Sequence, residues 1–321
     1  MLNPRVLVCA DRPGWAIDRL AKPITERVEN CDLCYFNTKE DRYLDSGYSK
    51  KGGVQYRTEL ANGYDIVHFH HLRAAISILG EVKARKILHI HTERDEYENV
   101  DLDRFDDIIC PTQNVVNFMA ERVERARVHF VPHGINLDKY VYKFRTPEPN
   151  IVGWVGRVME HKRFDVVLNA ICAAGLKMAG VGYIDDTRPF VRHSKDVKEG
   201  RDFNFSIFYP ENKMADFYAN LNLFVCLSKP GIEVGPLPVM EAMACGIPVI
   251  TTRVGWAADH CIHGSDVWFV EEDEIKNLDK IIRCVYDDMN LRRKLRDNGI
   301  RLVSKFGLDA YTNKIKEIYA I

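Results

Sequence analysis

The sequence predicts an α/β protein made of two Rossmann-like domains. Its 321 residues suggest two domains, because domains commonly have about 100–200 residues. Short apolar strands alternate with helix-period segments along most of the chain, a pattern typical of parallel sheets covered by helices. A polar stretch with two prolines, residues 145–150, has the composition of a linker. We therefore expect a first domain at 1–148 and a second at 149–307.

Composition excludes several classes of protein. The formal net charge is −1 and the charged residues are interspersed, so no basic footprint for nucleic acid or polybasic membrane patch is present. No apolar run approaches the ~20 residues that span a bilayer, and the N-terminus lacks a signal-peptide core. The nine cysteines are scattered, and the lone pair Cys31 and Cys34 cannot complete a four-ligand zinc site. We expect a cytoplasmic protein without integral membrane association.

In the first domain, apolar runs and helical periodicity define the elements in order. The segment 37–55 is polar and contains Gly52 and Gly53, so we expect a long functional loop or lid there. A single glycine, Gly14, follows the first strand, and Trp15 comes next as a possible stacking group for an acceptor. Strands are predicted at 5–10, 31–36, 65–70, 87–91, 107–110 and 128–131, and helices from the turn at 11–15 to 28 and over 112–125.

The second domain shows the same alternation. A helix over 237–245 is expected to stop at Gly246, since glycine just past a helix end, with Pro248 soon after, ends helices. Strands are predicted at 151–156, 176–183, 203–209, 223–227, 248–252 and 267–270, and further helices at 214–220, 272–287, 290–305 and 308–321.

Two strands of the first domain carry histidine pairs. His68 and His70 lie on one strand, His89 and His91 on another, and the period of two places each pair on one face. The H-x-H pattern suits a transition metal in principle, but no acidic residue completes a hydrolase motif. Half-buried structural histidines are the alternative, and a role at a ligand site is the third. We expect no metal site.

Two glutamates eight positions apart mark residues 228–252. Glu233 lies in a loop at the carboxyl end of a strand, and Glu241 lies in the helix that follows. Ligands of open α/β sheets bind at this edge, and a helix start offers free N–H groups and a partial positive charge. The two carboxylates can therefore accept hydrogen bonds from sugar hydroxyls, although a solvated pair of acids has the same spacing.

A pair of cations follows the first strand of the second domain. Gly156 lets the backbone approach a ligand closely, and Arg157 and Lys162 can reach the same volume above the strand end. Two cations there suit a diphosphate through charge-assisted hydrogen bonds and need no metal; surface cations beside a turn are the alternative. Tyr209 is expected to contact the base of a nucleotide.

These motifs together resemble the retaining glycosyltransferases of family 4, which have the GT-B fold. The long match comprises Ser228, Glu233, Gly235, the run 241–246 and the run 248–250, and Gly156, Arg157 and Lys162 match the family's G-R-x(4)-K element. The histidine pairs resemble two strand ends of that family. The sequence departs from the family at four places: Val234 and Pro236 in the loop, Arg163 after the lysine, the single Gly14, and residues 254–256, which stand where the family has a Gly-Gly loop.

The resemblance implies a GT-B fold with two Rossmann-like domains facing across a cleft and a final helix, 308–321, crossing back to the first domain. It implies catalytic roles for His91, Arg157, Lys162 and Glu233, and an acceptor side with Gly14, Trp15, His68 and His70. Donor-binding residues implied by the match are Gly156, Arg157, Lys162, Tyr209, Ser228, Glu233, Val234, Gly235, Pro236, Leu237 and Glu241.

The implied reaction is transfer of a sugar from a nucleotide-diphosphate-sugar donor to a hydroxyl, with retention, by a metal-independent front-face mechanism. The donor is a co-substrate, and no cofactor is expected. The acceptor would be a soluble glycan, a small molecule or a macromolecule, including a modified nucleic-acid base, because no basic amphipathic surface helix indicates a lipid acceptor. The alternatives are a sugar-nucleotide 2-epimerase of GT-B architecture and an inactive nucleotide-sugar-binding subunit.

Overall fold

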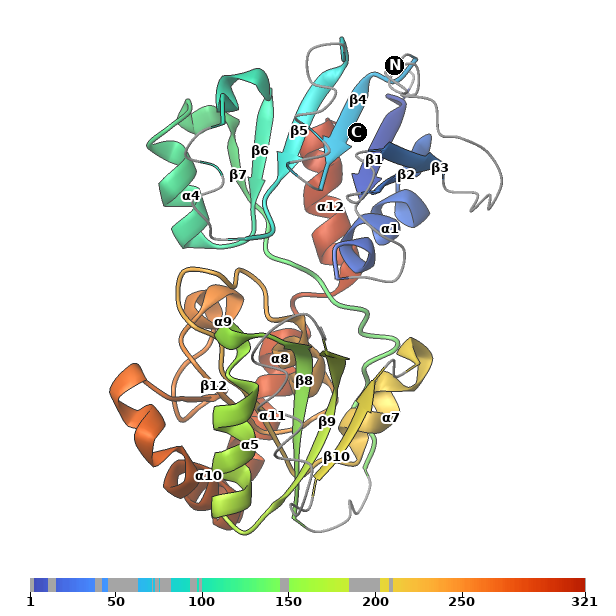
Figure 1. The fold of residues 1–321 in the computed structure, drawn as a ribbon. Helices are drawn as coiled ribbons and strands as arrows, with labels where there is room; N and C mark the ends of the chain where they lie inside the picture. Colours follow the sequence, from blue (N-terminus) through green and yellow to red (C-terminus); the bar gives the residue numbers. More distant parts are fainter. Residues whose placement is uncertain are drawn as a thin grey trace. The chain divides into compact units, whose positions relative to one another are not determined.

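The protein folds into two units, each built on a β-sheet flanked by helices, as predicted (Figure 1). Unit 1 comprises Met1–Gly134 and Leu308–Ile321, and unit 2 comprises Ile135–Gly307. The computed structural model describes residues 3–10, 16–37, 42–45, 63–70, 72, 75, 82–92, 97, 100–144, 150–184, 203–207 and 210–320.

The division between the units falls earlier than the boundary expected at 148. The Ile135 N–H donates to the Phe306 carbonyl at 3.0 Å. Ile135 and Tyr140 are also buried within a hydrophobic cluster of unit 2. These contacts attach the segment after Gly134 to unit 2 although it precedes the proline-bearing stretch.

The sheet of unit 1 has the strand order β3-β2-β1-β4-β5-β6-β7. Every described pairing is parallel except that of β2 with β3. The strands are β1 (Val6–Ala10), β2 (Cys31–Asn37), β3 (Arg42–Asp45), β4 (Ile66–Phe69), β5 (Arg85–His89), β6 (Asp107–Cys110) and β7 (Val128–Phe130).

Strand β3 corrects the expectation of a loop over 37–55. Its register pairs Asn37 with Arg42 and Phe36 with Tyr43. The outer edge of β2 offers unpaired backbone groups, and tyrosine favours strands, so the short polar segment adds to the sheet. The rest of that segment, 38–41 and 46–55, lies outside the described residues.

Two helices cover one face of the unit 1 sheet. α1 (Asp18–Arg27) and α12 (Leu308–Tyr319) share a hydrophobic cluster with inward-facing residues of β1, β4, β5 and β6. α4 (Gln113–Ala120) is capped by Thr112, whose hydroxyl accepts a hydrogen bond from the Val115 N–H at 3.3 Å. The helix ends before residue 125, where its end was predicted. The 3₁₀ turns are η2 (Leu102–Arg104) and η3 (Arg125–Arg127).

The sheet of unit 2 has the order β10-β9-β8-β11-β12-β13, and all its described pairings are parallel. Its strands are β8 (Ile151–Val158), β9 (Lys177–Ile184), β10 (Phe203–Ile207), β11 (Leu223–Cys226), β12 (Val249–Thr251) and β13 (Trp268–Phe269). Its helices are η4 (Glu160–Lys162), α5 (Phe164–Ala173), η5 (Glu211–Lys213), α7 (Met214–Ala219), α8 (Leu237–Ala244), α9 (Gly255–His260), η6 (Glu272–Asn277), α10 (Leu278–Asp287) and α11 (Met289–Val303).

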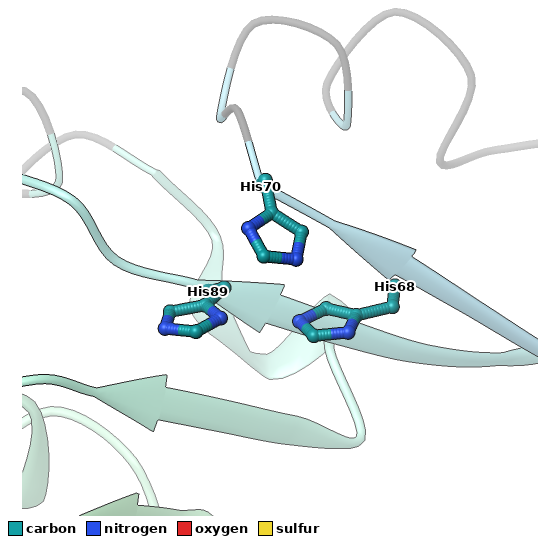
Figure 2. A group of neighbouring side chains, drawn as sticks. All are labelled: His68, His70 and His89. Carbon is teal, nitrogen blue, oxygen red and sulfur yellow. The ribbon is translucent and has the colours of Figure 1, made fainter. Parts of the chain in front are cut away.

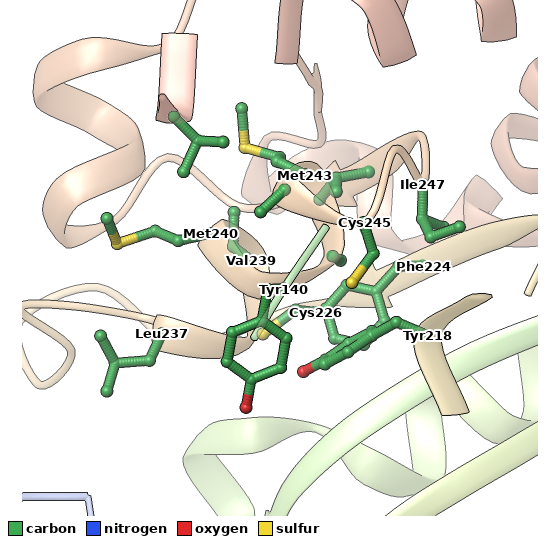
Figure 3. Packing of buried hydrophobic residues seen from close by; sticks show 14 of the residues in the cluster. Tyr140, Tyr218, Phe224, Cys226, Leu237, Val239, Met240, Met243, Cys245 and Ile247 are labelled. Carbon is green, nitrogen blue, oxygen red and sulfur yellow. The ribbon is translucent and has the colours of Figure 1, made fainter. Parts of the chain in front are cut away.

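Strand alternation in β11 separates two hydrophobic clusters of unit 2. Phe224 and Cys226 face the cluster that holds α8, part of which is drawn in Figure 3. Leu223 and Val225 face the opposite cluster, with α5 and α10. α8 is apolar almost all round, and most of its residues are buried, as expected for a helix inside a core.

Gly246 ends α8, which confirms the predicted stop. Its φ of 75° is left-handed. Its N–H donates to the Met243 carbonyl and that of Ile247 to the Ala242 carbonyl, both at 2.9 Å, which forms a Schellman motif. Two predictions for the same unit were incomplete: the segment 272–287 divides into η6 and α10, and α9 was not expected. Among the described residues, no helix has the length and apolarity to cross a membrane.

Candidate active site

Lys162 and Glu233 meet at the carboxyl edge of the unit 2 sheet. Lys162 ends η4 after β8, and Glu233 lies in the loop between β11 and α8. The Lys162 ammonium group forms an ion pair with the Glu233 carboxylate. Ser228 Oγ donates to the same Glu233 Oε2 at 3.2 Å. Because β8 and β11 are adjacent in the sheet, residues 71 positions apart come together there.

This ion pair is largely withdrawn from solvent. The side chains of Lys162 and Glu233 are only 16% and 17% exposed. Burial lowers the pKa of Lys162 from its usual value, because the charged ammonium loses hydration. Lys162 is expected to bind a diphosphate, and Glu233 a sugar. In this structure the two side chains pair with each other instead. An anionic ligand at Lys162 would have to displace or share the carboxylate.

The start of α8 offers fewer N–H groups than expected. The Leu237 N–H donates to the Gly235 carbonyl at 2.7 Å, and Val239 donates to the Pro236 carbonyl at 2.8 Å. Pro236 and Pro238 have no N–H. Of the residues from Gly235 to Leu237, Pro236 therefore has no N–H to offer a ligand, and the Leu237 N–H is engaged within the turn. Two prolines and a tight turn at Pro236 (φ −71°, ψ 78°) are the physical reason.

Gly255 fixes the loop that carries Glu233. It begins α9 with a left-handed φ of 52°. A Cβ at this position would lie 2.5 Å from the Val234 carbonyl oxygen and 2.7 Å from that of Glu233. The Trp256 N–H donates to the same Val234 carbonyl at 2.9 Å. Sequence reasoning identified Gly255 and Trp256 only as part of an altered family loop and did not predict that they support the loop of Glu233.

Glu241 is buried in the core of unit 2. The residue is 1% exposed, and its Oε2 accepts a hydrogen bond from the Tyr218 hydroxyl at 2.8 Å. Tyr218 lies on α7 and is itself fully buried. This carboxylate, predicted to accept hydrogen bonds from sugar hydroxyls, is therefore held by a tyrosine.

Tyr218→Phe is expected to lower the free energy of unfolding by about 1–3 kcal/mol, because a buried carboxylate loses a donor. Urea unfolding at pH 7 measures this change. Tyr286→Phe removes the same atom from an exposed hydrogen bond to Asn150 and should cost less. Equal losses in the two variants would contradict the assignment.

The other predicted donor residues of unit 2 lie nearby in sequence but serve packing as well. Arg157 is half-buried on β8. Gly156 pairs with Gly182 of β9, and a Cβ on Gly156 would lie 3.3 Å from the Trp154 ring. A Cβ at this position would press on the Trp154 ring, so local packing also favours a glycine. Tyr209 lies outside the described residues, and so do Gly14 and Trp15 of the predicted acceptor side.

Histidines gather at the carboxyl ends of β4 and β5 in unit 1. The register pairs Phe69 with Leu88, so His70 and His89 follow at neighbouring positions. Figure 2 shows the rings of His68, His70 and His89 grouped there. β5 ends at His89, two residues before the predicted end at His91.

Among the described residues, the cluster contains five histidines. His68, His70 and His89 form one group whose ring nitrogens lie within 4.8 Å of one another. His89, His91 and His133 form a second group within the same distance. His70 Nδ1 and His91 Nε2 are 3.0 Å apart, and the His89 and His91 rings stack at 4.5 Å. The prediction named His68, His70 and His91 as site residues; it omitted His89 and His133.

Four of the five rings are buried, which favours their neutral form. His68, His70, His89 and His133 are 0–4% exposed. Burial lowers the pKa of His68 to about 3 and that of His133 to about 4. It also holds the pKa values of His70 and His89 well below the usual value. Neutral imidazole rings keep a lone pair available for a donor or a metal.

Many of these ring nitrogens have no hydrogen-bond partner. Among the described residues, His89 and His133 have none at either nitrogen, and His68 and His70 have none at Nε2. An unsatisfied buried polar group costs about 1–3 kcal/mol. Two nitrogens of these rings have partners: His68 Nδ1 lies 2.6 Å from the Tyr319 hydroxyl of α12, and His70 Nδ1 lies 3.0 Å from His91 Nε2.

Unit 1 should lose stability as the pH falls below about 6.5, the pKa of an unfolded histidine. Below this pH the unfolded chain binds protons that the buried rings do not. The contribution of these rings to the free energy of unfolding is therefore full above this pH and declines toward pH 4. Each buried ring contributes up to about 1.4 kcal/mol per pH unit. Urea unfolding with a chelator present, at pH 7.5 and at pH 5, measures the slope. His133→Gln should give a shallower slope; a flat profile would contradict the account.

Comparison with known proteins matches the second half of the chain to one protein family. The profile described as "Glycosyl transferases group 1" matches residues 141–302, half of the chain. The capsular polysaccharide biosynthesis glycosyltransferase CapM of Staphylococcus aureus is 26% identical over 176 residues, 53% of this chain and 45% of CapM. The chain spans about half the length of the curated relatives it matches.

Solved structures match nearly the whole chain. HepE of Anabaena, in complex with UDP and glucose, has a TM-score of 0.77 at 14% identity, covering 98% of this chain and 99% of HepE. Sucrose-phosphate synthase of Thermosynechococcus elongatus has a TM-score of 0.76 at 16% identity, covering 98% of both chains. At these identities the likeness establishes a shared fold.

Proposed function

Because the chain belongs to the group 1 glycosyl transferases and has a GT-B fold, we propose that it transfers a sugar from a nucleotide-diphosphate-sugar donor to a hydroxyl acceptor. Transfer proceeds with retention of the anomeric configuration. The observation that carries this proposal is the meeting of Lys162, Glu233 and Ser228 at the carboxyl edge of the unit 2 sheet. Ligands bind at this edge in open α/β folds.

The ion pair supports a donor-dependent exchange of partners. Without donor, Glu233 neutralises Lys162 in a site where both side chains are mostly buried. A diphosphate carries more charge than one carboxylate and can take Lys162, with Arg157 as the second cation. Glu233 is then released to accept hydrogen bonds from the hydroxyls of the sugar. Two cations neutralise the leaving diphosphate, so this site needs no metal for that purpose.

The proposed mechanism has no enzymic nucleophile. Charge develops on the leaving phosphate as the glycosidic bond breaks, and Lys162 and Arg157 stabilise it; such electrostatic stabilisation is commonly a large catalytic term. The departing phosphate oxygen accepts the proton of the acceptor hydroxyl on the same face of the sugar, which yields retention. The Val234 and Gly235 amides assist at the sugar.

The donor nucleotide is proposed to be UDP. HepE was solved with UDP, and the shared fold makes UDP the first nucleotide to test. Glu241 is the proposed ribose ligand, and it would exchange its bond to Tyr218 for ribose hydroxyls.

Glu241→Ala is expected to weaken nucleotide affinity by about 10-fold, the equivalent of one net hydrogen bond to a charged group. Calorimetric titration of the variant and the parent with UDP measures the ratio. The control is Glu160→Ala, which removes an exposed carboxylate paired with Lys229 and should leave the affinity unchanged. Unaltered affinity in Glu241→Ala would separate this residue from the ribose.

Unit 1 is proposed to serve the acceptor. We propose that His91, the half-buried member of the histidine cluster, is the catalytic residue of this unit. His68 and His70 are fully buried, so we propose that they support His91 rather than contact an acceptor. The acceptor class remains a soluble glycan, a small molecule or a macromolecule.

Donor cleavage with water as the simplest hydroxyl acceptor tests the function. The full chain is incubated with UDP-, GDP- and ADP-sugars, release of nucleoside diphosphate is followed, and NMR identifies the first-formed anomer of the free sugar. We expect one donor to be cleaved and its anomeric configuration to be retained. An inverted first product would refute retention. Failure of every donor to bind or react would refute the function.

A further inference from the structure

The histidine cluster of unit 1 has the composition of a metal site. His68 and His70 come from β4, and His89 ends the adjacent strand β5 (Figure 2). Their rings lie close, with centroids 4.4 Å apart for His68 and His70 and 4.7 Å apart for His70 and His89. Imidazole nitrogens are preferred ligands of zinc and related transition metals.

The ring nitrogens that lack a hydrogen-bond partner indicate a metal site more directly than the closeness of the rings does. His68 and His70 each have one ring nitrogen engaged, with Tyr319 and His91 respectively. In both rings the other nitrogen, Nε2, is buried without a partner among the described residues, and His89 has two such nitrogens. The engaged nitrogen of each ring can carry the proton, which leaves Nε2 with a lone pair. Three buried lone pairs without a donor are a feature that a cation would satisfy.

We propose that His68, His70 and His89 bind one Zn²⁺ ion in unit 1. Ligand nitrogens at about 2.0–2.1 Å from a tetrahedral zinc ion are separated by about 3.4 Å, and one ring nitrogen from each of the three histidines already lies within 4.8 Å of those of the other two. Binding of the ion requires these nitrogens to move to the shorter spacing. Three protein ligands leave a fourth position for water or another oxygen ligand, as in open zinc sites.

Tyr319 of α12 is the proposed positioning residue. Its hydroxyl lies 2.6 Å from His68 Nδ1, and the hydroxyl oxygen can accept a hydrogen bond from Nδ1–H, which leaves the Nε2 lone pair for the metal. A metal-binding histidine usually donates a hydrogen bond from the N–H of its second ring nitrogen to such a partner, which fixes the tautomer. The last helix of the chain therefore contributes to the site from the far end of the sequence.

Zinc content of the full-length protein tests the proposal. Protein stripped with chelator is dialysed against Zn²⁺ and the bound metal is measured by mass spectrometry; a tetrahedral Co²⁺ absorption spectrum provides an independent readout. We expect about one ion per chain. His68→Gln, His70→Gln and His89→Gln should each lose it. His129→Gln, which alters a histidine bound to Asp107 outside the cluster, should retain it.

Two Tyr→Phe variants on α12 test the proposal even where a histidine variant fails to fold. Tyr319→Phe should weaken Zn²⁺ affinity by about 10–100-fold. Tyr311→Phe is the matched control, because Tyr311 is equally buried on α12 but its hydroxyl has no partner among the described residues; its affinity should not change.

Three outcomes would overturn the assignment. The first is the absence of stoichiometric Zn²⁺ in the parent protein. The second is equal affinity in Tyr319→Phe and Tyr311→Phe. The third is loss of metal in His91→Gln and His133→Gln with retention in His68→Gln and His70→Gln, which would place the ion at the second group. None of these outcomes depends on nucleotide binding by unit 2.

Discussion

Lys162→Ala is expected to reduce the rate of sugar transfer by about 10²–10³-fold, the effect of removing one preorganised stabiliser of developing charge. The ammonium group is held at the carboxyl edge of the sheet by Glu233 and is mostly buried, so solvent cannot replace it efficiently. Initial rates of nucleoside diphosphate release, measured with saturating donor, give the change. Affinity for the nucleoside diphosphate should fall as well.

Lys229→Ala is the matched control for this prediction. Lys229 pairs with Glu160 at 2.6 Å in unit 2, but the two side chains are 41% and 80% exposed. Solvent screens such an exposed ion pair strongly, so both the rate and the stability should change little. Similar rates for Lys162→Ala and the parent would remove the diphosphate clamp from the proposed mechanism.

Gly255→Ala is expected to lower the free energy of unfolding by about 3 kcal/mol or more. A left-handed φ alone costs an alanine about 1–2 kcal/mol. The new methyl group would also lie 2.5–2.7 Å from the carbonyl oxygens of Val234 and Glu233, and backbone cannot move aside as a side chain can. The loop that carries Glu233 must shift, so nucleotide-sugar binding should weaken. Urea unfolding and donor titration measure the two effects.

Gly175→Ala separates the two causes. Gly175 has a similar left-handed φ of 70°, but no atom lies within 4 Å of an added Cβ. Only the conformational cost of about 1–2 kcal/mol should appear, with donor affinity unchanged. If Gly255→Ala were no worse than Gly175→Ala, the contact between α9 and the donor loop would not support the site.

The unit around α8 was predictable because its signals are local. An apolar strand, a glycine-stopped helix and a second apolar strand follow one another between residues 223 and 252, and each boundary has its own residue chemistry. Helix α9 was missed because it has only six residues and begins with a glycine, which is a weak helix former. Strand β3 was missed because its polar composition indicated a loop; its partner strand stabilises it.

The partners of the site residues were less accessible to sequence reasoning than the residues themselves. Period-two spacing placed each histidine pair on one face of a strand, but only the pairing of β4 with β5 brings the pairs together. His133 joins them after β7, and Tyr319 joins from the last helix. The pairing of Lys162 with Glu233 likewise depends on strand order. Propensity and motif spacing contain no information on such long-range contacts.

The thermal shift of the full chain with UDP, GDP, ADP and their sugar conjugates tests the central claim most directly. Ligands that bind the folded state raise the melting temperature by mass action. Each nucleotide is compared with its own blank, with and without EDTA, so that any effect of EDTA on the protein alone cancels. We predict a rise with one nucleotide, UDP first among them, that EDTA does not reduce and that Lys162→Ala abolishes. Absence of a shift with every nucleotide, or a shift that requires divalent metal, would contradict the proposed donor site.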